Sequence, residues 1–234
     1  MKQKGEEMKI IQTDNPNIYK GFEKVGDVEE PYFTKAIDDF RFYKEYRVVW
    51  KGEEYRYWNP HKSKWALHVR KKEVRSLLKS DISLLYLGAA TGTSLSHLAD
   101  VVKKGKLYAV EFSSTSFRRL KILGEKRSNV FPLLFDASRP EAYLDLVAPV
   151  DLLYMDISQP NQWDIFRKNL EIFLKKNGTA LFVLKERSLT LRQKPSEIKK
   201  EIEKEMKEHD LSILLKYDLH PYHKDHLTYV LKQR

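Results

Sequence analysis

Hydrophobic residues recur along this chain in short runs, and the spacing of those runs predicts its elements of structure. Residues 10–58 show no long helical periodicity and are typical of short strands. Two of these runs, Tyr46–Trp50 and Tyr55–Trp58, flank a Lys-Gly-Glu-Glu stretch with Gly52 at the turn, which is the pattern of a β-hairpin. We therefore predict a small β-rich module over residues 1–60.

A different pattern occupies residues 61–234, where strand-like runs alternate with stretches that can form helices. Helices are expected over residues 62–79, over residues 160–176 with Asn177-Gly178 as the C-terminal cap, and over residues 195–209. The strand candidates are residues 84–87, 107–112, 130–135, 150–155, 180–184, 211–217 and 227–231. Since a helix-capable stretch follows each of the first five, the pattern predicts an α/β domain with a mainly parallel, doubly wound sheet.

Composition limits the class of protein further. At 234 residues with 41% hydrophobic and 12% aromatic content, the chain is expected to be folded and soluble. No apolar run approaches the roughly 18 residues of a membrane span, and the lysine-rich start lacks the apolar core of a signal peptide. With no cysteine, disulfides and thiolate zinc sites are excluded. The expected location is the cytoplasm, with no membrane partner and no bound metal.

The net charge of +10 favours a polyanionic partner, with nucleic acid as the leading class. Charge alone leaves a second interpretation open, in which charged residues solvate the surface and form the ion pairs of a heat-adapted protein. The same two interpretations apply to the basic cluster of Arg70, Lys71, Lys72 and Arg75, which is either a solvated helix face or part of a track for RNA.

The first strand of the α/β domain runs into a small turn and then a helix, in the stretch LLYLGAATGTSLSHLAD. Gly88 and Gly92 stand four residues apart, whereas dinucleotide-binding turns have the pattern G-x-G-x-x-G. Ala90 takes the place of the glycine that lets the backbone approach a pyrophosphate. The turn therefore suits a ligand that needs close backbone approach and a helix N-terminus but carries less phosphate than a dinucleotide.

Ionisable residues end four successive strands, and the carboxyl ends of parallel strands meet at one edge of a sheet. Glu111 lies at the spacing after Gly88 at which a carboxylate accepts from two ribose hydroxyls; alternatively it is a surface glutamate. Asp136 is placed to accept from an adenine amino group, with Phe112 and Ala137 beside the ring, or else it caps the following helix. Lys185 is either functional or a surface lysine extended into water.

These features together indicate S-adenosylmethionine as the cofactor. It carries an adenosine but no phosphate, and its amino-acid carboxylate suits the backbone N–H groups where a helix begins, at Thr91–Ser94. The glycine turn by itself is a weak signal. With Glu111, Asp136 and Asp156 following in series it becomes a strong one.

Several stretches resemble the successive motifs of the fibrillarin family, the ribose 2'-O-methyltransferases of box C/D ribonucleoproteins. They are YLGAATGTS, VEFS, DLLYMDISQPNQ, LFVLKERS, PYHKDH and, ahead of the sheet, YRYWNPHKSKWA. The similarity runs from about residue 10 to residue 234, without the glycine- and arginine-rich extension of the eukaryotic proteins, which favours the short archaeal form. It implies a Rossmann-like, S-adenosylmethionine-dependent methyltransferase fold whose seven-stranded, mostly parallel sheet has an antiparallel last strand.

The resemblance also implies roles for individual residues. Those expected to contact the methyl donor, together with Gly88 and Ala90 of the glycine turn, are Thr93, Ser94, Glu111, Phe112, Asp136, Ala137, Asp156, Ile157, Ser158 and Gln159. Lys64, Asp156 and Lys185 fall on the catalytic set of the family, and His226 on a fourth polar position of related enzymes. His226 could equally form a hydrogen bond across the sheet. Whether Lys185 removes the ribose proton or stabilises the developing alkoxide stays open at this stage.

The expected function is therefore guide-RNA-directed methylation of ribose 2'-hydroxyls in rRNA, with tRNA as a second target class. Nothing in the chain encodes a reader of nucleotide sequence. The resemblance implies partners that supply it: a C/D guide RNA paired with the target RNA, a Nop-domain scaffold protein and a kink-turn-binding ribosomal-type protein. Two alternatives are a non-catalytic RNA- or scaffold-binding subunit and a base methyltransferase, although the latter usually shows an Asn-Pro-Pro-Tyr motif or a cysteine nucleophile.

Overall fold

The computed structural model describes residues 8–189 and 194–233, which form two compact units. The first unit contains the chain up to Ser80 together with Thr93–Lys103, and the second contains Asp81–Gly92 and everything from Lys104 onward. Within the described ranges, no helix has both the length and the apolar character needed to cross a membrane.

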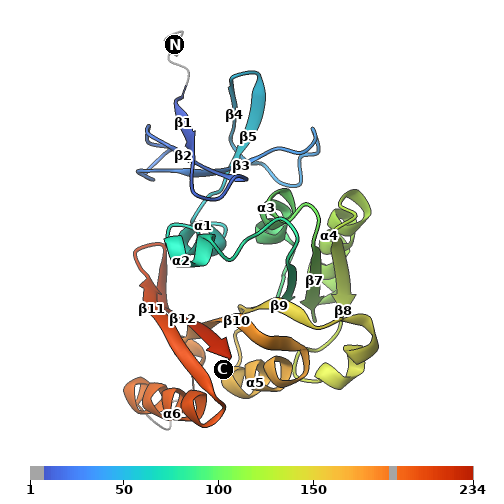
Figure 1. Ribbon diagram of the computed structural model, residues 1–234, viewed down its shortest axis with the longest axis vertical. Coiled ribbons are helices and arrows are strands. Elements are labelled where there is room, and N and C mark those ends of the chain that lie inside the picture. The colour runs from blue at the N-terminus through green and yellow to red at the C-terminus, as the bar shows by residue number, and fades with distance from the viewer. Residues whose placement is uncertain (1–7, 190–193, 234) are drawn as a thin grey trace. The chain divides into compact units, whose positions relative to one another are not determined.

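The first unit is built on a five-stranded antiparallel sheet in the order β1-β2-β3-β5-β4 (Figure 1). Its strands are β1 (Ile10–Gln12), β2 (Ile18–Gly21), β3 (Tyr32–Lys35), β4 (Arg47–Trp50) and β5 (Glu53–Tyr57). The predicted hairpin is confirmed, because β4 pairs with β5 across Lys51 and Gly52, which both have positive φ angles. Two consecutive residues with positive φ match the right-handed twist of a hairpin.

The helix predicted over residues 62–79 is wrong as a single element. The structure has two short helices there, α1 (Trp65–His68) and α2 (Lys72–Arg75), separated at Lys71, whose ψ of 121° is extended. Val69 and Val74 are both fully buried, yet residues five apart point to different faces of a helix. The break at Lys71 brings both side chains into the core.

A cluster of buried charges joins α3 (Thr93–Val101) to strands of the first unit. Arg56 Nη1 donates to Asp100 Oδ2 at 2.6 Å, and both side chains are almost completely buried. Thr34 Oγ1 also donates to Asp100 Oδ2 and lies 2.9 Å from His97 Nδ1, while the Tyr43 hydroxyl lies 2.6 Å from His97 Nε2. Since the Thr34 proton goes to Asp100, His97 donates from Nδ1 and accepts at Nε2 as a neutral ring.

The second unit is a seven-stranded sheet in the order β11-β12-β10-β9-β6-β7-β8. Its strands are β6 (Ser83–Leu87), β7 (Lys106–Glu111), β8 (Val130–Leu134), β9 (Val150–Met155), β10 (Leu174–Lys185), β11 (Leu211–Leu219) and β12 (His223–Gln233). All seven predicted strands are confirmed. The sheet is parallel except for β12, which runs antiparallel to its neighbours β10 and β11, so the expected antiparallel last strand is present.

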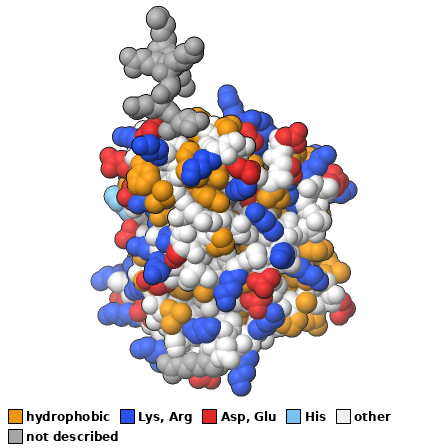
Figure 2. Space-filling view, turned by 45° about the horizontal axis from the view of Figure 1, so that its top comes forward, with side chains coloured by type: hydrophobic (Ala, Val, Ile, Leu, Met, Phe, Trp, Pro, Cys, Tyr) orange, Lys and Arg blue, Asp and Glu red, His pale blue; other side chains and the backbone are white. Residues whose placement is uncertain are grey.

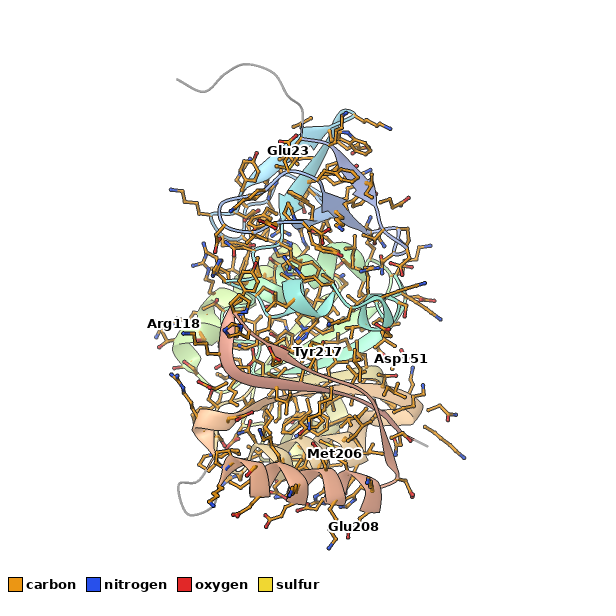
Figure 3. The ribbon with its side chains drawn as sticks, turned by 90° about the vertical axis from the view of Figure 1, so that its left-hand side faces the viewer. Glu23, Arg118, Asp151, Met206, Glu208 and Tyr217 are labelled. Atoms are coloured by element: carbon orange, nitrogen blue, oxygen red, sulfur yellow. The ribbon has the colours of Figure 1, made fainter. Side chains whose placement is uncertain are left out.

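Helices flank this sheet and bury its apolar strands. They are α4 (Ser114–Lys126), η1 (Pro140–Leu146), α5 (Gln162–Phe173), η2 (Glu186–Ser188) and α6 (Pro195–Glu208). On α6, Met206 is fully buried against the sheet whereas Glu208 points outward (Figure 3). This division is that of an amphipathic surface helix.

The cap predicted for the helix of residues 160–176 is wrong. Helix α5 ends at Phe173, and β10 begins at once with Leu174. Asn177 adopts a φ of 62° inside an irregularity of β10 between Leu174 and Thr179. A Cβ at Gly178 would lie 2.7 Å from the Leu174 side chain, so the Asn-Gly pair makes a tight turn within the strand and does not cap the helix.

Candidate functional site

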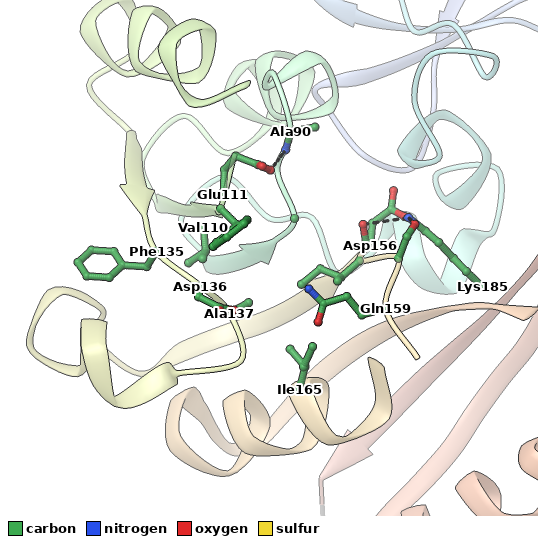
Figure 4. A pocket seen from close by; sticks show the side chains of 14 residues that line it. Ala90, Val110, Glu111, Phe135, Asp136, Ala137, Asp156, Gln159, Ile165 and Lys185 are labelled. Carbon is green, nitrogen blue, oxygen red and sulfur yellow. Dashed lines mark hydrogen bonds and ion pairs between the residues drawn. The ribbon is translucent and has the colours of Figure 1, made fainter. Parts of the chain in front are cut away.

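A cavity of about 260 Å³ opens at the carboxyl ends of the parallel strands in the second unit (Figure 4). Most of the residues predicted to contact the methyl donor line it, together with Lys185. The predicted lining residues are Gly88, Ala90, Glu111, Phe112, Asp136, Ala137, Asp156, Ile157, Ser158, Gln159 and Lys185, and Val110, Phe135 and Ile165 complete the wall. Because the carboxyl ends of the parallel strands meet at one edge of the sheet, residues spread over nearly 100 positions of the sequence lie together around this cavity.

Gly88 makes the floor of this cavity possible. It has a φ of 79°, and a Cβ there would lie 2.9 Å from both the carbonyl oxygen of Asp156 and Cγ1 of Ile157. The backbone N–H of Asp156 donates to the carbonyl of Leu87 at 3.0 Å. A side chain at position 88 would push apart the turns that follow β6 and β9.

Glu111 connects the turn after β6, which contains Ala90, to the turn after β7. Glu111 Oε2 accepts from the backbone N–H of Ala90 at 2.8 Å, drawn in Figure 4, and Oε1 accepts from Ser113 N–H at 2.8 Å. Ala90 has a positive φ of 49°, which is uncommon for a residue with a Cβ. A carboxylate has about four acceptor positions, so Glu111 holds both turns and retains capacity for further donors.

The loop after β8 supplies Asp136 and Ala137. Asp136 Oδ1 accepts from the backbone N–H of Ser138 at 2.8 Å. The N-cap position of η1 is taken by Arg139 and not by Asp136. The helix-cap alternative for Asp136 is therefore wrong, because its side chain closes a turn before the helix. The carbonyl of Ala137 accepts at 2.8 Å from the amide of Asn169, a fully buried residue of α5.

Lys185 and Asp156 form an ion pair beside the cavity. Lys185 Nζ lies 2.8 Å from Asp156 Oδ1, 2.8 Å from Ser158 Oγ and 3.2 Å from the Asp156 carbonyl oxygen. The two side chains are only 14% and 13% exposed. Lys185 therefore folds over the loop that follows β9, and the alternative of a lysine extended into water is wrong.

Two buried amides that sequence analysis did not single out hold the rim of the cavity from α5. Gln162 makes two hydrogen bonds to the backbone of Lys185, and Asn169 holds Ala137. The signal that could have revealed them is their position on the apolar face of the helix, since they are seven residues, or two turns, apart. A polar residue on a buried face has to find hydrogen-bond partners.

Two other residues predicted to contact the methyl donor, Thr93 and Ser94, begin α3 and belong to the first unit. Lys64, predicted to be catalytic, belongs to the same unit. Ser94 Oγ lies 2.8 Å from Ser63 Oγ, which accepts from Trp58 Nε1 at 2.9 Å. Lys64 follows Ser63 and is half-buried at the start of α1. Roles for these three residues in donor binding or catalysis stay predictions.

His226 does not line the cavity, but it lies opposite Lys185 where β12 pairs with β10. Its Nδ1 is 2.6 Å from the carbonyl oxygen of Lys224, so this nitrogen carries the proton. The structure thus gives His226 a local hydrogen bond along its own strand. Its catalytic role stays a prediction.

The parallel sheet with one antiparallel strand and a cavity at the strand ends is the Rossmann-like fold of methyltransferases, as expected. A fibrillarin pre-rRNA processing protein from Methanococcus jannaschii superposes with a TM-score of 0.85 at 36% identity, covering 98% of this chain and 99% of that one. An Aeropyrum pernix fibrillarin with natively bound S-adenosyl-L-methionine gives 0.84 at 33% identity, covering 96% and 99%.

The sequence places the chain within this class. A sequence model of the Fibrillarin family matches residues 12–234, and the chain belongs to that family. It is 39% identical to a fibrillarin-like rRNA/tRNA 2'-O-methyltransferase of Pyrococcus abyssi over 88% of this chain and 92% of the relative. It is also similar, at 40% identity and a TM-score of 0.76, to a fibrillarin solved in complex with Nop5p, covering 87% of this chain and 94% of that one.

Proposed function

We propose that this protein transfers the methyl group of S-adenosylmethionine to ribose 2'-hydroxyls of rRNA and tRNA, at sites chosen by a C/D guide RNA. The observation that carries the proposal is the cavity where Glu111, Asp136, Asp156 and Lys185 meet at one sheet edge. It combines acceptors for a nucleoside with a lysine-aspartate pair that can act on a hydroxyl. The activities named for the fibrillarin relatives support the same assignment.

The residues around the cavity fit the donor. Glu111 has unused acceptor capacity for ribose hydroxyls, and Phe112, which is 73% exposed, offers an apolar surface for a purine ring beside Ala137. Gly88 lets the backbone come close where a side chain would fill the space. Bound S-adenosylmethionine supplies a methyl group activated by the sulfonium.

Lys185 and Asp156 act on the nucleophile. A ribose hydroxyl attacks poorly near neutral pH, so the site has to accept its proton or stabilise the charge that develops on its oxygen. The Lys185 ammonium donates to the Asp156 carbonyl oxygen and to Ser158 Oγ, and it forms an ion pair with Asp156 Oδ1. A ribose hydroxyl entering the site replaces one of these partners, while Asp156 keeps the lysine oriented. Lys64 and His226 complete the proposed catalytic set.

Target choice comes from the assembly. The net charge of +10 suits contacts with RNA phosphates, which are independent of sequence. On the face shown in Figure 2, Lys and Arg side chains are interspersed with Asp and Glu. Such a mixed surface suits a protein that contacts RNA phosphates but binds RNA weakly without its partners. The Nop5p complex of the fibrillarin relative supports a Nop-domain scaffold, and the fibrillarin resemblance supports the guide RNA and a kink-turn-binding protein.

Reconstitution with these partners tests the proposal. The protein, scaffold, kink-turn-binding protein, guide RNA and target RNA are incubated with methyl-labelled S-adenosylmethionine, and the product is mapped by nuclease digestion. We expect one 2'-O-methylated ribose opposite the guide, and no site-specific label when the guide is omitted. Label on a base, or no label although the particle assembles and binds the donor, would refute the proposal and favour a non-catalytic binding subunit.

A further inference from the structure

The side chain of Gln162 forms hydrogen bonds with the backbone of Lys185, the proposed catalytic lysine. It is the first residue of α5, and its side chain is fully buried. Its Oε1 accepts from the backbone N–H of Lys185 at 2.9 Å, and its Nε2 donates to the Lys185 carbonyl oxygen at 3.1 Å. Both ends of one amide thus bind the two backbone polar groups of a single residue.

The sheet explains why Lys185 needs this partner. Strand β10 pairs with β9 as far as Phe182 and Met155, where β9 ends and the chain turns into the loop of Asp156–Gln159. On its other side, Lys185 lies opposite His226 of β12. An amide offers a donor and an acceptor as a peptide group does, so Gln162 takes the place of the missing β9 backbone beside Lys185.

We infer that Gln162 is a positioning residue that fixes the backbone of Lys185 so that the ammonium meets Asp156 at the edge of the cavity. The 2.8 Å contact between Lys185 Nζ and Asp156 Oδ1 depends on where β10 ends, and Gln162 determines that point. The part of this inference that concerns turnover rests on the proposed function. The part that concerns the Lys185 backbone does not.

Substitution of Gln162 by methionine keeps the length of the side chain and removes both hydrogen bonds. We expect Gln162→Met to lower the single-turnover rate of methyl transfer at saturating donor by about 10- to 100-fold, since small misplacements of a reacting group have effects of this size. Affinity for S-adenosylmethionine should stay within about twofold of wild type, because Gln162 does not line the cavity. A wild-type rate in the folded variant would overturn the inference.

Gln162→Glu provides a readout that a merely structural role would not move. A protonated carboxyl group can accept from the Lys185 N–H and donate to its carbonyl, whereas the ionised form loses the donor and repels that carbonyl. Burial favours the protonated form. We expect the ratio of the Gln162→Glu rate to the wild-type rate to rise about tenfold or more as pH falls from about 8.5 to 6, and a constant ratio would contradict the positioning role.

Asn169 is the matched control on the same helix. It is equally buried, and its amide holds the carbonyl oxygens of Ala137 and Ile165 instead of Lys185. Asn169→Leu should therefore weaken donor binding through the loop after β8. At saturating donor, the loss of single-turnover rate in Asn169→Leu should be smaller than in Gln162→Met, and an equal loss would show that any buried amide on α5 has this effect.

Amide hydrogen exchange separates this inference from the proposed function. The Lys185 N–H donates to Gln162, so its exchange should accelerate about tenfold or more in Gln162→Met and remain unchanged in Asn169→Leu. If the wild-type particle transfers no methyl group, the proposed function fails while the exchange experiment still decides whether Gln162 fixes the Lys185 backbone. Unchanged exchange at Lys185 in Gln162→Met would overturn the inference.

Discussion

Strands β9 and β10 carry two lysine-aspartate pairs, one near each end, and the two pairs have different surroundings. Lys175 Nζ lies 2.8 Å from Asp151 Oδ1 where the strands begin, and Lys185 Nζ lies 2.8 Å from Asp156 Oδ1 where they end. The side chains of the first pair are 45% and 41% exposed, whereas those of the second are 14% and 13% exposed. The second pair lines the cavity of the candidate site, and the first is not part of its lining.

This comparison shows that residue type and distance do not make a site. Burial would raise the pKa of Asp151, but the bonds from Lys175 and Ser83 outweigh it and lower that pKa. An exposed pair of this kind contributes little to stability. At the carboxyl end, partial burial removes water around Asp156 and Lys185 and leaves room for a ligand, so the same two groups are available for chemistry.

The largest expected effect comes from removing the carboxylate at the cavity. Asp156→Ala should lower methyl transfer by about 10²–10⁴-fold, because Lys185 loses its orienting partner. It should also weaken donor binding, because Asp156 lines the cavity. Single-turnover rates and calorimetry measure the two effects, with Asp151→Ala as the control at the other end of β9. Equal losses in both variants would remove the distinction between the two pairs.

A smaller effect is expected at the donor side of the cavity. Glu111→Ala removes a charged acceptor that also holds Ala90 and Ser113, and each hydrogen bond to a charged group contributes about 1.5–3 kcal/mol. Affinity for S-adenosylmethionine should fall about 10- to 100-fold, as measured by calorimetry on the isolated protein. Undiminished affinity with the fold intact would show that Glu111 does not hold the donor.

A third set of polar residues, the buried cluster around His97 in the first unit, affects the stability of the protein. Burial, together with the cations of Arg56 and Arg47, lowers the pKa of His97 well below its usual value. Below about pH 6.5 the unfolded chain binds a proton at this position that the folded chain does not, so stability is complete above that pH and declines as pH falls. The decline attributable to His97 is at most about 1.4 kcal/mol per pH unit.

Urea unfolding between about pH 7 and pH 5 measures this slope. In His97→Gln, a side chain that does not titrate replaces the ring. The free energy of unfolding should therefore depend less steeply on pH over this range, by a slope that corresponds to the uptake of about one proton on unfolding. Identical slopes in the two proteins would show that His97 is protonated in the folded state, which would contradict the low pKa that burial beside Arg56 and Arg47 gives this ring.

The smallest effect is expected for the exposed pair. Lys175→Ala should change the free energy of unfolding by less than about 1 kcal/mol, and salt should reduce the difference further. Urea unfolding at low and high salt measures it. A loss of several kcal/mol would mean that the pair near the start of β10 matters for folding and cannot serve as a neutral control.

Local patterns in the sequence predicted the seven strands and the ionisable groups that end four of them. Strand periodicity, and the fact that parallel strands end at one edge of a sheet, need no knowledge of the tertiary structure. The break at Lys71 was missed, since it follows from the burial of both Val69 and Val74 in the folded unit. Gln162 was missed because its partner Lys185 lies 23 positions away, and no local pattern shows that β9 ends before β10 does.

The most direct test of the central claim compares the two lysines in the assembled, guided particle. Single-turnover methyl transfer at saturating S-adenosylmethionine is measured for wild type, Lys185→Ala, Lys185→Arg and Lys175→Ala, with donor affinity measured alongside. We predict that Lys185→Ala loses about 10²–10⁴-fold in rate with nearly unchanged donor affinity, and that Lys175→Ala matches wild type. An inactive Lys185→Arg would indicate proton removal by the lysine, because a guanidinium cannot act as a base, and an active one would indicate charge stabilisation. A wild-type rate in Lys185→Ala would contradict the account, because the lysine-aspartate pair at the cavity would then have no part in the reaction.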